Sequence, residues 1–172
     1  MISDLIHGFA RPGRIEGIYL RPKRHVPVRA VESAIAIAEH GLEGDHSAIH
    51  SIKRSGGSIR QVTLIQAEHL PVIASFLASD SIDPSLLRRN LVVSGLNLVA
   101  CRTLLKNHPV ELHIGDQVLL KLTGNCAPCS RMEEALGIGG YNAVRGHGGV
   151  TASIIIGGYI SLHDAVICSA AQ

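Results

Sequence analysis

Aromatic residues are scarce in this sequence, and tryptophan is absent. Phenylalanine and tyrosine make up 3% of the 172 residues, so aliphatic side chains must fill the core and few rings are available for base stacking. Charged residues make up only 17% of the chain, and the formal net charge is +2. This charge is too small to indicate binding to nucleic acid or to an anionic membrane. We therefore expect no nucleic-acid partner and no membrane partner.

Long apolar segments are missing as well. No apolar run approaches the length of a membrane span, and residues 1–14 lack the continuous apolar stretch of a secretory signal. Four cysteines in a chain of this length do not form a disulfide framework. These features predict a cytoplasmic protein in which the cysteines are thiols or ligands.

The chain has neither an internal repeat nor a GxGxxG or Walker-type loop that would indicate a nucleotide-binding fold. Hydrophobic residues make up 46% of the sequence, without any low-complexity run, which is typical of an ordered globular protein. A length of 172 residues suits one domain with a substantial core. We expect a single domain over residues 1–172.

Short apolar segments separated by turn residues recur along the chain. Alternation and composition predict helices at 66–77 and 130–136, and strands at 14–20, 30–39, 60–65, 91–93, 111–114, 117–122, 151–156 and 159–168. Pro71 fits the first helix only if it lies in the first turn. Many short strands and few short helices predict a mostly β fold, built as a closed or partly closed barrel.

Three polar segments connect these elements. The basic residues 21–27 are interpreted as a solvated turn, and the polar residues 50–58 as a mobile segment that could act as a lid. Gly41 and Gly44 predict a tight turn that brings Asp45 and His46 together. Loop hydrogen bonding and a ligand contact are about equally good interpretations of Asp45.

The segment Cys126-Ala127-Pro128-Cys129 is the best candidate for chemistry. It follows a predicted strand and precedes the predicted helix at 130–136, so Cys129 lies beside a helix start. Unpaired backbone N–H groups there favour an anion, which makes the thiolate of Cys129 easier to reach. We interpret Cys126 as a small buried residue and Cys129 as a reactive or metal-bound sulfur.

Two cysteines at this spacing leave three interpretations open. A structural zinc site needs two further ligands at short spacing, which the sequence does not offer. A metal-free CxxC thiol redox pair needs only the two sulfurs, although thioredoxin-type surroundings are missing. A single thiolate that carries sulfur or binds a metal-containing cofactor needs nearby cations and N–H donors, which residues 88–90 and 145–149 could supply.

Five segments, taken together and in this order, resemble a stand-alone MOSC domain, the module named after the C-terminal part of molybdenum cofactor sulfurases. The resemblance covers about residues 14–168. The segments are Gly41-Leu42-Glu43-Gly44-Asp45, Arg60-Gln61-Val62-Thr63-Leu64-Ile65, Arg88-Arg89-Asn90-Leu91-Val92-Val93, residues 124–132 and Arg145-Gly146-His147-Gly148-Gly149. Each motif alone is loose, whereas five in sequence are specific.

The resemblance implies a β-barrel-type MOSC fold that binds the molybdenum cofactor, a pyranopterin with a dithiolene and a phosphate. By similarity to the related amidoxime-reducing enzymes, Cys129 is the expected molybdenum ligand and catalytic residue. A soft thiolate suits such a metal, and guanidinium and backbone N–H groups suit a phosphate. The resemblance also implies a set of cofactor contacts, which comprises Arg60, Arg88, Arg89, Asn90, Arg145, His147 and Gly148.

The sequence departs from the family pattern at His46, where a basic Arg or Lys often follows Gly-Asp. The chain also contains no pyridoxal-phosphate-dependent desulfurase domain and no flavin, haem or iron–sulfur motif. The first hypothesis is therefore reduction of N-hydroxylated or N-oxygenated small molecules, with electrons from a separate donor protein. The alternative is a sulfur carrier or cofactor-delivery protein, in which Cys129 holds a persulfide received from a cysteine desulfurase.

Overall fold

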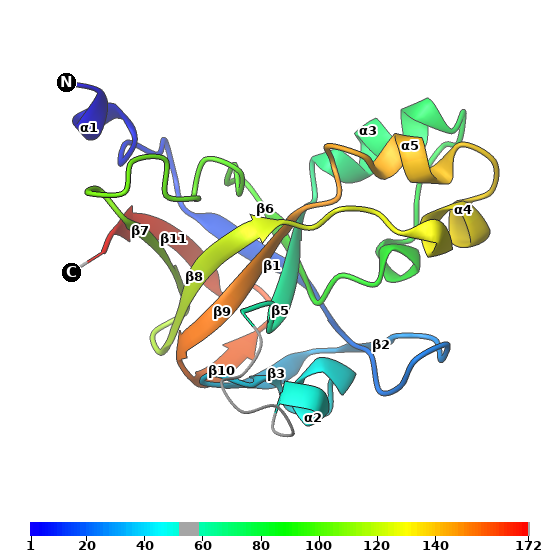
Figure 1. The fold of residues 1–172 in the computed structure, drawn as a ribbon, viewed down its shortest axis with the longest axis horizontal. Coiled ribbons are helices and arrows are strands. Elements are labelled where there is room, and N and C mark those ends of the chain that lie inside the picture. The colour runs from blue at the N-terminus through cyan, green and yellow to red at the C-terminus, as the bar shows by residue number, and fades with distance from the viewer. Residues whose placement is uncertain (52–58, 172) are drawn as a thin grey trace.

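Seven strands close into a β-barrel (Figure 1) in the computed structural model, which describes residues 1–51 and 59–171. The strand order is β11-β7-β8-β9-β5-β6-β1, and antiparallel pairing of β1 with β11 closes the ring. The strands of the barrel are β1 (Gly13–Leu20), β5 (Val62–Gln66), β6 (Leu91–Ser94), β7 (Val110–Ile114), β8 (Val118–Asn125), β9 (Val150–Ile156) and β11 (Ala165–Ala170).

The barrel follows from the alternation of its strands. In β7 every second residue is buried, and Val110, Leu112 and Ile114 point into an aliphatic core. Strand β5 differs, because all five of its residues are buried. Its inward residue Leu64 belongs to the barrel core, whereas Ile65 belongs to a second cluster shared with the helices. A strand covered on both faces needs this continuous apolar composition.

Two further sheet segments extend the barrel. The short strand β2 (Arg29–Val31) pairs with the end of β1. Strands β3 (Ser33–Ile37), β4 (Gly41–Leu42) and β10 (Gly158–Ser161) form a separate three-stranded sheet in the order β10-β3-β4. Strand β4 of this sheet leads directly into the turn at Asp45, whose backbone N–H donates to the carbonyl oxygen of Leu42 at 3.0 Å.

The helices are short, and three of them cover one side of the barrel. Figure 1 shows α3 (His69–Phe76), α4 (Ser130–Leu136) and α5 (Gly140–Val144) grouped together, far from α1 (Ile2–Leu5). The remaining ones are α2 (His46–Ser51) and the 3₁₀ turn η1 (Pro84–Leu87). Within the described parts of the chain, no helix has the length and apolar character needed to cross a membrane.

The mostly β barrel predicted from the sequence is confirmed, with corrections to single elements. The helix predicted at 66–77 begins only at His69, because β5 continues to Gln66, and Pro71 lies in its first turn as required. The strand predicted at 30–39 is divided into β2 and β3. The glycine-rich stretch after Gly139 contains helix α5, which the sequence did not predict. Most of the proposed lid, residues 52–58, lies outside the described residues.

Candidate functional site

The cysteine segment links the end of β8 to the start of α4. Asn125 pairs with Val150 at the start of β9, and the Cys126 backbone N–H donates to the carbonyl oxygen of Gly149 at 2.8 Å. Cys129 is the N-cap residue of α4, with an extended backbone at φ −125° and ψ 175°. The Cys129 side chain is exposed, whereas Cys126 is half-buried. The chain therefore presents one accessible sulfur at this position.

Arg89 ties three backbone segments together beneath the cysteines. Its Nε donates to the carbonyl oxygen of Gly148 at 2.7 Å, its Nη1 to Leu87 at 3.0 Å and its Nη2 to Cys126 at 3.4 Å. The residue is only 8% exposed. Burial lowers the pKa of Arg89, and attraction to Cys126 and Cys129 opposes this effect. The guanidinium is thus committed to protein carbonyls and fixes the cysteine segment.

Gly148 permits its backbone to lie close to that of Cys126, and Arg89 donates to the carbonyl oxygens of both residues. A Cβ atom at this position would overlap the carbonyl oxygen of Cys126, so no larger residue fits without a shift of the backbone. The neighbouring Gly149 has φ +89°, in the left-handed region that glycine favours, and its backbone lies against Leu64 of β5. The glycine-rich segment therefore contacts the cysteine segment through its backbone.

Asn90 belongs to a buried polar network beside this segment. Its Oδ1 accepts from the backbone N–H of Thr63 at 3.1 Å, and its Nδ2 donates to Asp45 at 2.9 Å. Asp45 also accepts from Arg21, with Nε at 3.0 Å and Nη2 at 2.9 Å, and from the Ser47 hydroxyl at 2.6 Å. Asp45 and Asn90 are both fully buried. The network joins β1, β5, β6 and the Asp45 turn.

The charge of Asp45 is stabilised within this network. Burial alone would raise the pKa of Asp45, but the hydrogen bonds and the positive charge of Arg21, together with bonds from Ser47, lower the pKa to about 2. Of the two interpretations left open by the sequence, Asp45 therefore fits loop hydrogen bonding. It holds Arg21 in place at the end of β1.

A basic cavity of about 400 Å³ lies above the network, lined by Arg21, Lys23, Arg24, His46, Ser47, Arg88 and Arg131. Arg88 has a left-handed backbone, φ 56°, and its Nη1 donates to the carbonyl oxygen of Val26 at 2.7 Å. Neither Arg88 nor Arg131 forms a salt bridge with a carboxylate among residues 1–51 and 59–171. The cavity therefore carries an excess of positive charge that suits an oxyanion.

Electrostatic effects also connect this cavity to Cys129. Burial lowers the pKa of Arg88, and repulsion from Arg131 and Arg21 lowers it further. Attraction to Asp45 and to Cys129 acts in the opposite direction. Cys129 itself does not line the basic cavity, but Arg131, two residues beyond it on the first turn of α4, does, so the start of α4 carries both the exposed sulfur and part of the cavity wall.

A second cavity of about 390 Å³ adjoins the first and shares Arg88 and Arg131 with it. We name it the mixed cavity, because apolar side chains form much of its lining. The other residues that line it are His25, Val26, Pro27, Val28, Ser85, Leu86, Met132, Glu134 and Ala135. Helix α4 thus contributes to both cavities.

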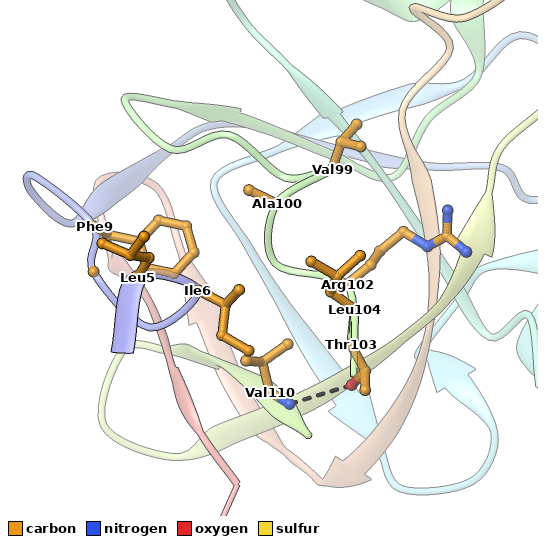
Figure 2. A pocket seen from close by; sticks show the side chains of 10 residues that line it. Leu5, Ile6, Phe9, Val99, Ala100, Arg102, Thr103, Leu104 and Val110 are labelled. Atoms are coloured by element: carbon orange, nitrogen blue, oxygen red, sulfur yellow. Dashed lines mark hydrogen bonds between the residues drawn. The ribbon is translucent and has the colours of Figure 1, made fainter. Parts of the chain in front are cut away.

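A third cavity, of about 390 Å³, lies between the α1 region and residues 99–104 and is mainly apolar (Figure 2). Figure 2 shows the Arg102 guanidinium directed away from Leu5, Ile6 and Phe9, and its Nη1 donates to Asn125 Oδ1 at 2.9 Å. The Thr103 hydroxyl accepts from the Val110 backbone N–H at 3.2 Å. These polar groups of the third cavity are already bonded to protein atoms. The basic cavity is therefore the better candidate for chemistry.

The structure divides the predicted site residues into two groups. Arg88 lines both cavities, whereas Cys129 lines neither and directly precedes α4, which contributes to both. Arg89, Asn90 and Gly148 are engaged in hydrogen bonds with other protein groups. Arg60, Arg145 and His147 line neither the basic nor the mixed cavity.

The second group lies elsewhere on the barrel. Arg60 is an exposed residue two positions before β5, and Arg145 is the exposed C-cap of α5. His147 contacts α3, with ring centroids 5.2 Å from His69 and 5.6 Å from Phe76. Burial, followed by repulsion from His147, lowers the pKa of His69. The position of His147 is therefore explained by packing against α3.

The sequence prediction missed most of the cations that line the basic cavity, namely Arg21, Lys23, Arg24 and Arg131. The interpretation of residues 21–27 as a solvated turn was incomplete, because Lys23 and Arg24 are exposed but line this cavity. Their signal in the sequence is a basic cluster that directly follows a strand. Arg131 lies within the cysteine motif itself. His46 lines the cavity too, so an imidazole occupies the place expected for a fixed cation.

A metal bound by protein side chains alone does not fit this site. Within the described residues, no three His, Cys, Asp or Glu side chains are grouped so that they could hold a metal ion. A metal that brings its own sulfur ligands needs only one protein thiolate, which Cys129 offers. The donor set of one exposed thiol and several guanidinium groups thus fits an anionic, sulfur-ligated metal cofactor.

Comparisons with solved structures identify similar folds. The YuaD protein from Bacillus subtilis is 18% identical, with a TM-score of 0.74, over 94% of this chain and 97% of that one. YiiM from Escherichia coli is 17% identical, with a TM-score of 0.63, over 92% of this chain and 70% of that one. YiiM from Geobacillus stearothermophilus is 13% identical, with a TM-score of 0.67, over 94% and 76%. These identities establish similarity of fold alone.

Searches by sequence give a second result. No curated protein matches the chain. A family model described as the MOSC domain matches residues 51–166, which is more than half of the 172 residues. This segment contains β5 to β9, the cysteine segment and the glycine-rich loop. The chain therefore belongs to the MOSC domain family.

Proposed function

We propose that this protein binds the molybdenum cofactor, with Cys129 as the protein ligand of molybdenum, and reduces N-hydroxylated or N-oxygenated small molecules. Membership of the MOSC family supports cofactor binding, because this family is associated with the molybdenum cofactor. The observation that carries the proposal is the start of α4, where the exposed Cys129 thiol is followed two residues later by Arg131 of the basic cavity.

Some residues of the site would contact the cofactor directly, and others would hold those residues in position. The phosphate of the cofactor would bind in the basic cavity, where Lys23, Arg24 and Arg88 supply charge and N–H donors. Arg89 and Asn90 are not direct contacts in this proposal, because their polar groups already bond to protein atoms. They hold the cysteine segment and Arg21 in position.

The chemistry follows from this arrangement. When bound, the cofactor supplies a metal that can change oxidation state by two electrons. The overall reaction breaks an N–O bond, consumes two electrons and two protons, and releases the reduced nitrogen compound and water. Cys129 would hold the metal, and the guanidinium groups of Arg88 and Arg131 would orient anionic groups near it. The chain offers no electron-carrier motif of its own, so a separate donor protein delivers the electrons.

Metal content tests the proposal directly. The protein and its Cys129→Ser variant are expressed in a host that produces the cofactor, and molybdenum is measured in each purified sample. We expect molybdenum in the original protein and at least tenfold less in Cys129→Ser, because a hydroxyl is a poor ligand for a soft metal. Retention of the metal by Cys129→Ser would remove Cys129 from the ligand role.

Cys126→Ser is the matched control, since it removes the other sulfur of the same segment. Its sulfur is half-buried, and we expect this variant to keep its molybdenum. Equal loss in both variants, together with a reversible disulfide on oxidation, would instead support the metal-free thiol redox pair. A persulfide on Cys129 without reductase activity would support the sulfur carrier and its cysteine desulfurase partner.

A further inference from the structure

Three segments of the chain form the mixed cavity, and one of them is helix α4, which follows Cys129. Residues 25–28 supply one wall, Ser85 and Leu86 of η1 a second, and residues 131–135 of α4 a third. A volume of about 390 Å³ is within the range of small-molecule sites. The cavity is therefore large enough for a compact organic molecule beside the proposed metal position.

The lining of this cavity has two distinct parts. Its apolar part comprises Val26, Pro27, Val28, Leu86, Met132 and Ala135. Its charged part consists of Arg88 and Arg131, which also line the basic cavity. One carboxylate, that of Glu134, lies on the exposed side of α4, and no ion pair joins it to either arginine within the described residues. Positive charge thus dominates where the two cavities meet.

The two arginines differ in how fully the protein uses them. Arg88 donates through Nη1 to Val26 and through Nη2 to Lys23, at 2.7 and 3.4 Å, which fixes its guanidinium. Arg131 contacts the His25 ring through Nη2, 2.9 Å from Nδ1. Among the described residues, no acceptor bonds Nε or Nη1 of Arg131. Arg131 therefore keeps donors that a bound anion could use.

We infer that the mixed cavity selects small substrates that combine an apolar ring or chain with an anionic group, and that Arg131 recognises the anion. The apolar body would contact Leu86 and Ala135, whose side chains are exposed, and the anion would lie at the junction with the basic cavity. The role of this cavity in catalysis depends on the proposed function, whereas its binding preference can be measured separately. Arg131 is thus assigned as a specificity-determining residue.

The two methionines of the chain make the cavity easy to observe. Met132 lines the cavity and is 2% exposed, whereas Met1 is 94% exposed at the N-terminus. With ¹³C-methyl methionine, the spectrum of the full chain should contain one resonance for the cavity and one internal control. Met132 does not line the basic cavity, so its resonance distinguishes binding in the mixed cavity from binding of an anion next door.

Sodium benzoate, benzamide and benzylammonium are suitable probes, because they share one ring and differ in charge. We expect benzoate to shift the Met132 resonance without affecting Met1, and to bind at least fivefold more tightly than benzamide, with benzylammonium weakest. Equal binding of all three would overturn the anionic preference. A Met132 resonance that no probe moves would overturn the cavity as a binding site.

Arg131→Gln tests the recognition of the anion. Loss of a charged donor should weaken benzoate about tenfold and leave benzamide almost unchanged. Lys121→Gln, on the exposed side of β8, removes the same charge elsewhere and should leave both affinities unchanged. An unaltered benzoate affinity in Arg131→Gln would overturn the role of Arg131.

Molybdenum is measured in the same samples, so that failure of the proposed function can be distinguished from failure of the inferred selectivity of the mixed cavity. Benzoate binding with the expected charge preference in a protein that never acquires molybdenum would overturn the proposed function and the substrate role, but not the selectivity of the cavity. A molybdenum-containing protein without benzoate binding would overturn the inference alone.

Discussion

Replacement of Asp45 by asparagine is expected to destabilise the protein by about 3 kcal/mol, the low end for breaking a buried ion pair. Asp45 is fully buried, and its carboxylate accepts from the side chains of Arg21, Ser47 and Asn90. Asparagine has nearly the same shape but carries an N–H₂ group, which would face these donors without the charge they require. The low end applies because the Arg21 side chain is 21% exposed and can be partly rehydrated. Urea unfolding followed by circular dichroism gives the free energy of unfolding.

Glu43→Gln provides the control for Asp45→Asn. Glu43 lies in the same turn with an exposed side chain, so the same chemical change there should alter the free energy of unfolding by less than about 0.5 kcal/mol. Equal effects of the two substitutions would mean that the turn as a whole, and not the buried network, determines stability.

The pH dependence of stability supplies a further expected result. The pKa of Asp45 is lowered from 3.8 to about 2, so its carboxylate stabilises the fold above the pKa of the unfolded chain. This contribution, about 2 kcal/mol, is lost as the pH falls through about 4 towards 2. The free energy of unfolding of Asp45→Asn should therefore fall less over this interval than that of the original protein. Parallel pH profiles would contradict the assigned charge.

The barrel could be predicted because its signals are local. Alternation in 111–114 and 117–122, and the turn at Gly115, give the hairpin of β7 and β8 with nearly correct bounds. The boundary between β5 and α3 was less predictable. Gln66 continues β5, and its apolar neighbours fit a helix and a buried strand equally well. The fully buried pattern of β5 depends on helices that lie far away in sequence.

The direction of the side chains in Arg88-Arg89-Asn90 was beyond prediction. The three residues are adjacent, yet Arg88 lines the cavities, Arg89 reaches the glycine-rich segment and Asn90 enters the Asp45 network. The cause is the left-handed backbone at Arg88, φ 56°, which separates η1 from β6. A non-glycine residue rarely adopts this conformation, and nothing in the sequence marks it.

The cations of the basic cavity were difficult to predict for another reason. A basic segment such as residues 21–25 is usually a solvated loop, and its sequence does not reveal what lies opposite. Here β1 pairs with β6, so that Arg21 at the end of β1 comes next to the start of β6. Long-range strand pairing, rather than local pattern, therefore brings Arg21 and Arg88 to one cavity with Arg131.

Arg89→Met is expected to loosen the cysteine segment and to lower stability by about 3 kcal/mol. Methionine can fill much of the space, but the carbonyl groups of Leu87, Cys126 and Gly148 would lose a charged donor, at about 1–3 kcal/mol for each group left unsatisfied. Some of these carbonyls can regain water, which keeps the sum near the lower limit. Urea unfolding measures this loss.

Two local measurements distinguish a loosened cysteine segment from general instability in Arg89→Met. The Cys126 amide, which donates to Gly149, should exchange its hydrogen faster. Iodoacetamide should also modify the half-buried Cys126 thiol faster in the absence of urea. Arg102→Met is the matched control, because it removes a single exposed hydrogen bond to Asn125, the last residue of β8 and the neighbour of Cys126. If Arg102→Met accelerates both reactions as much as Arg89→Met does, the hydrogen bonds of Arg89 are not what fixes the cysteine segment. If only Arg89→Met does so, one buried guanidinium fixes the backbone that presents Cys129.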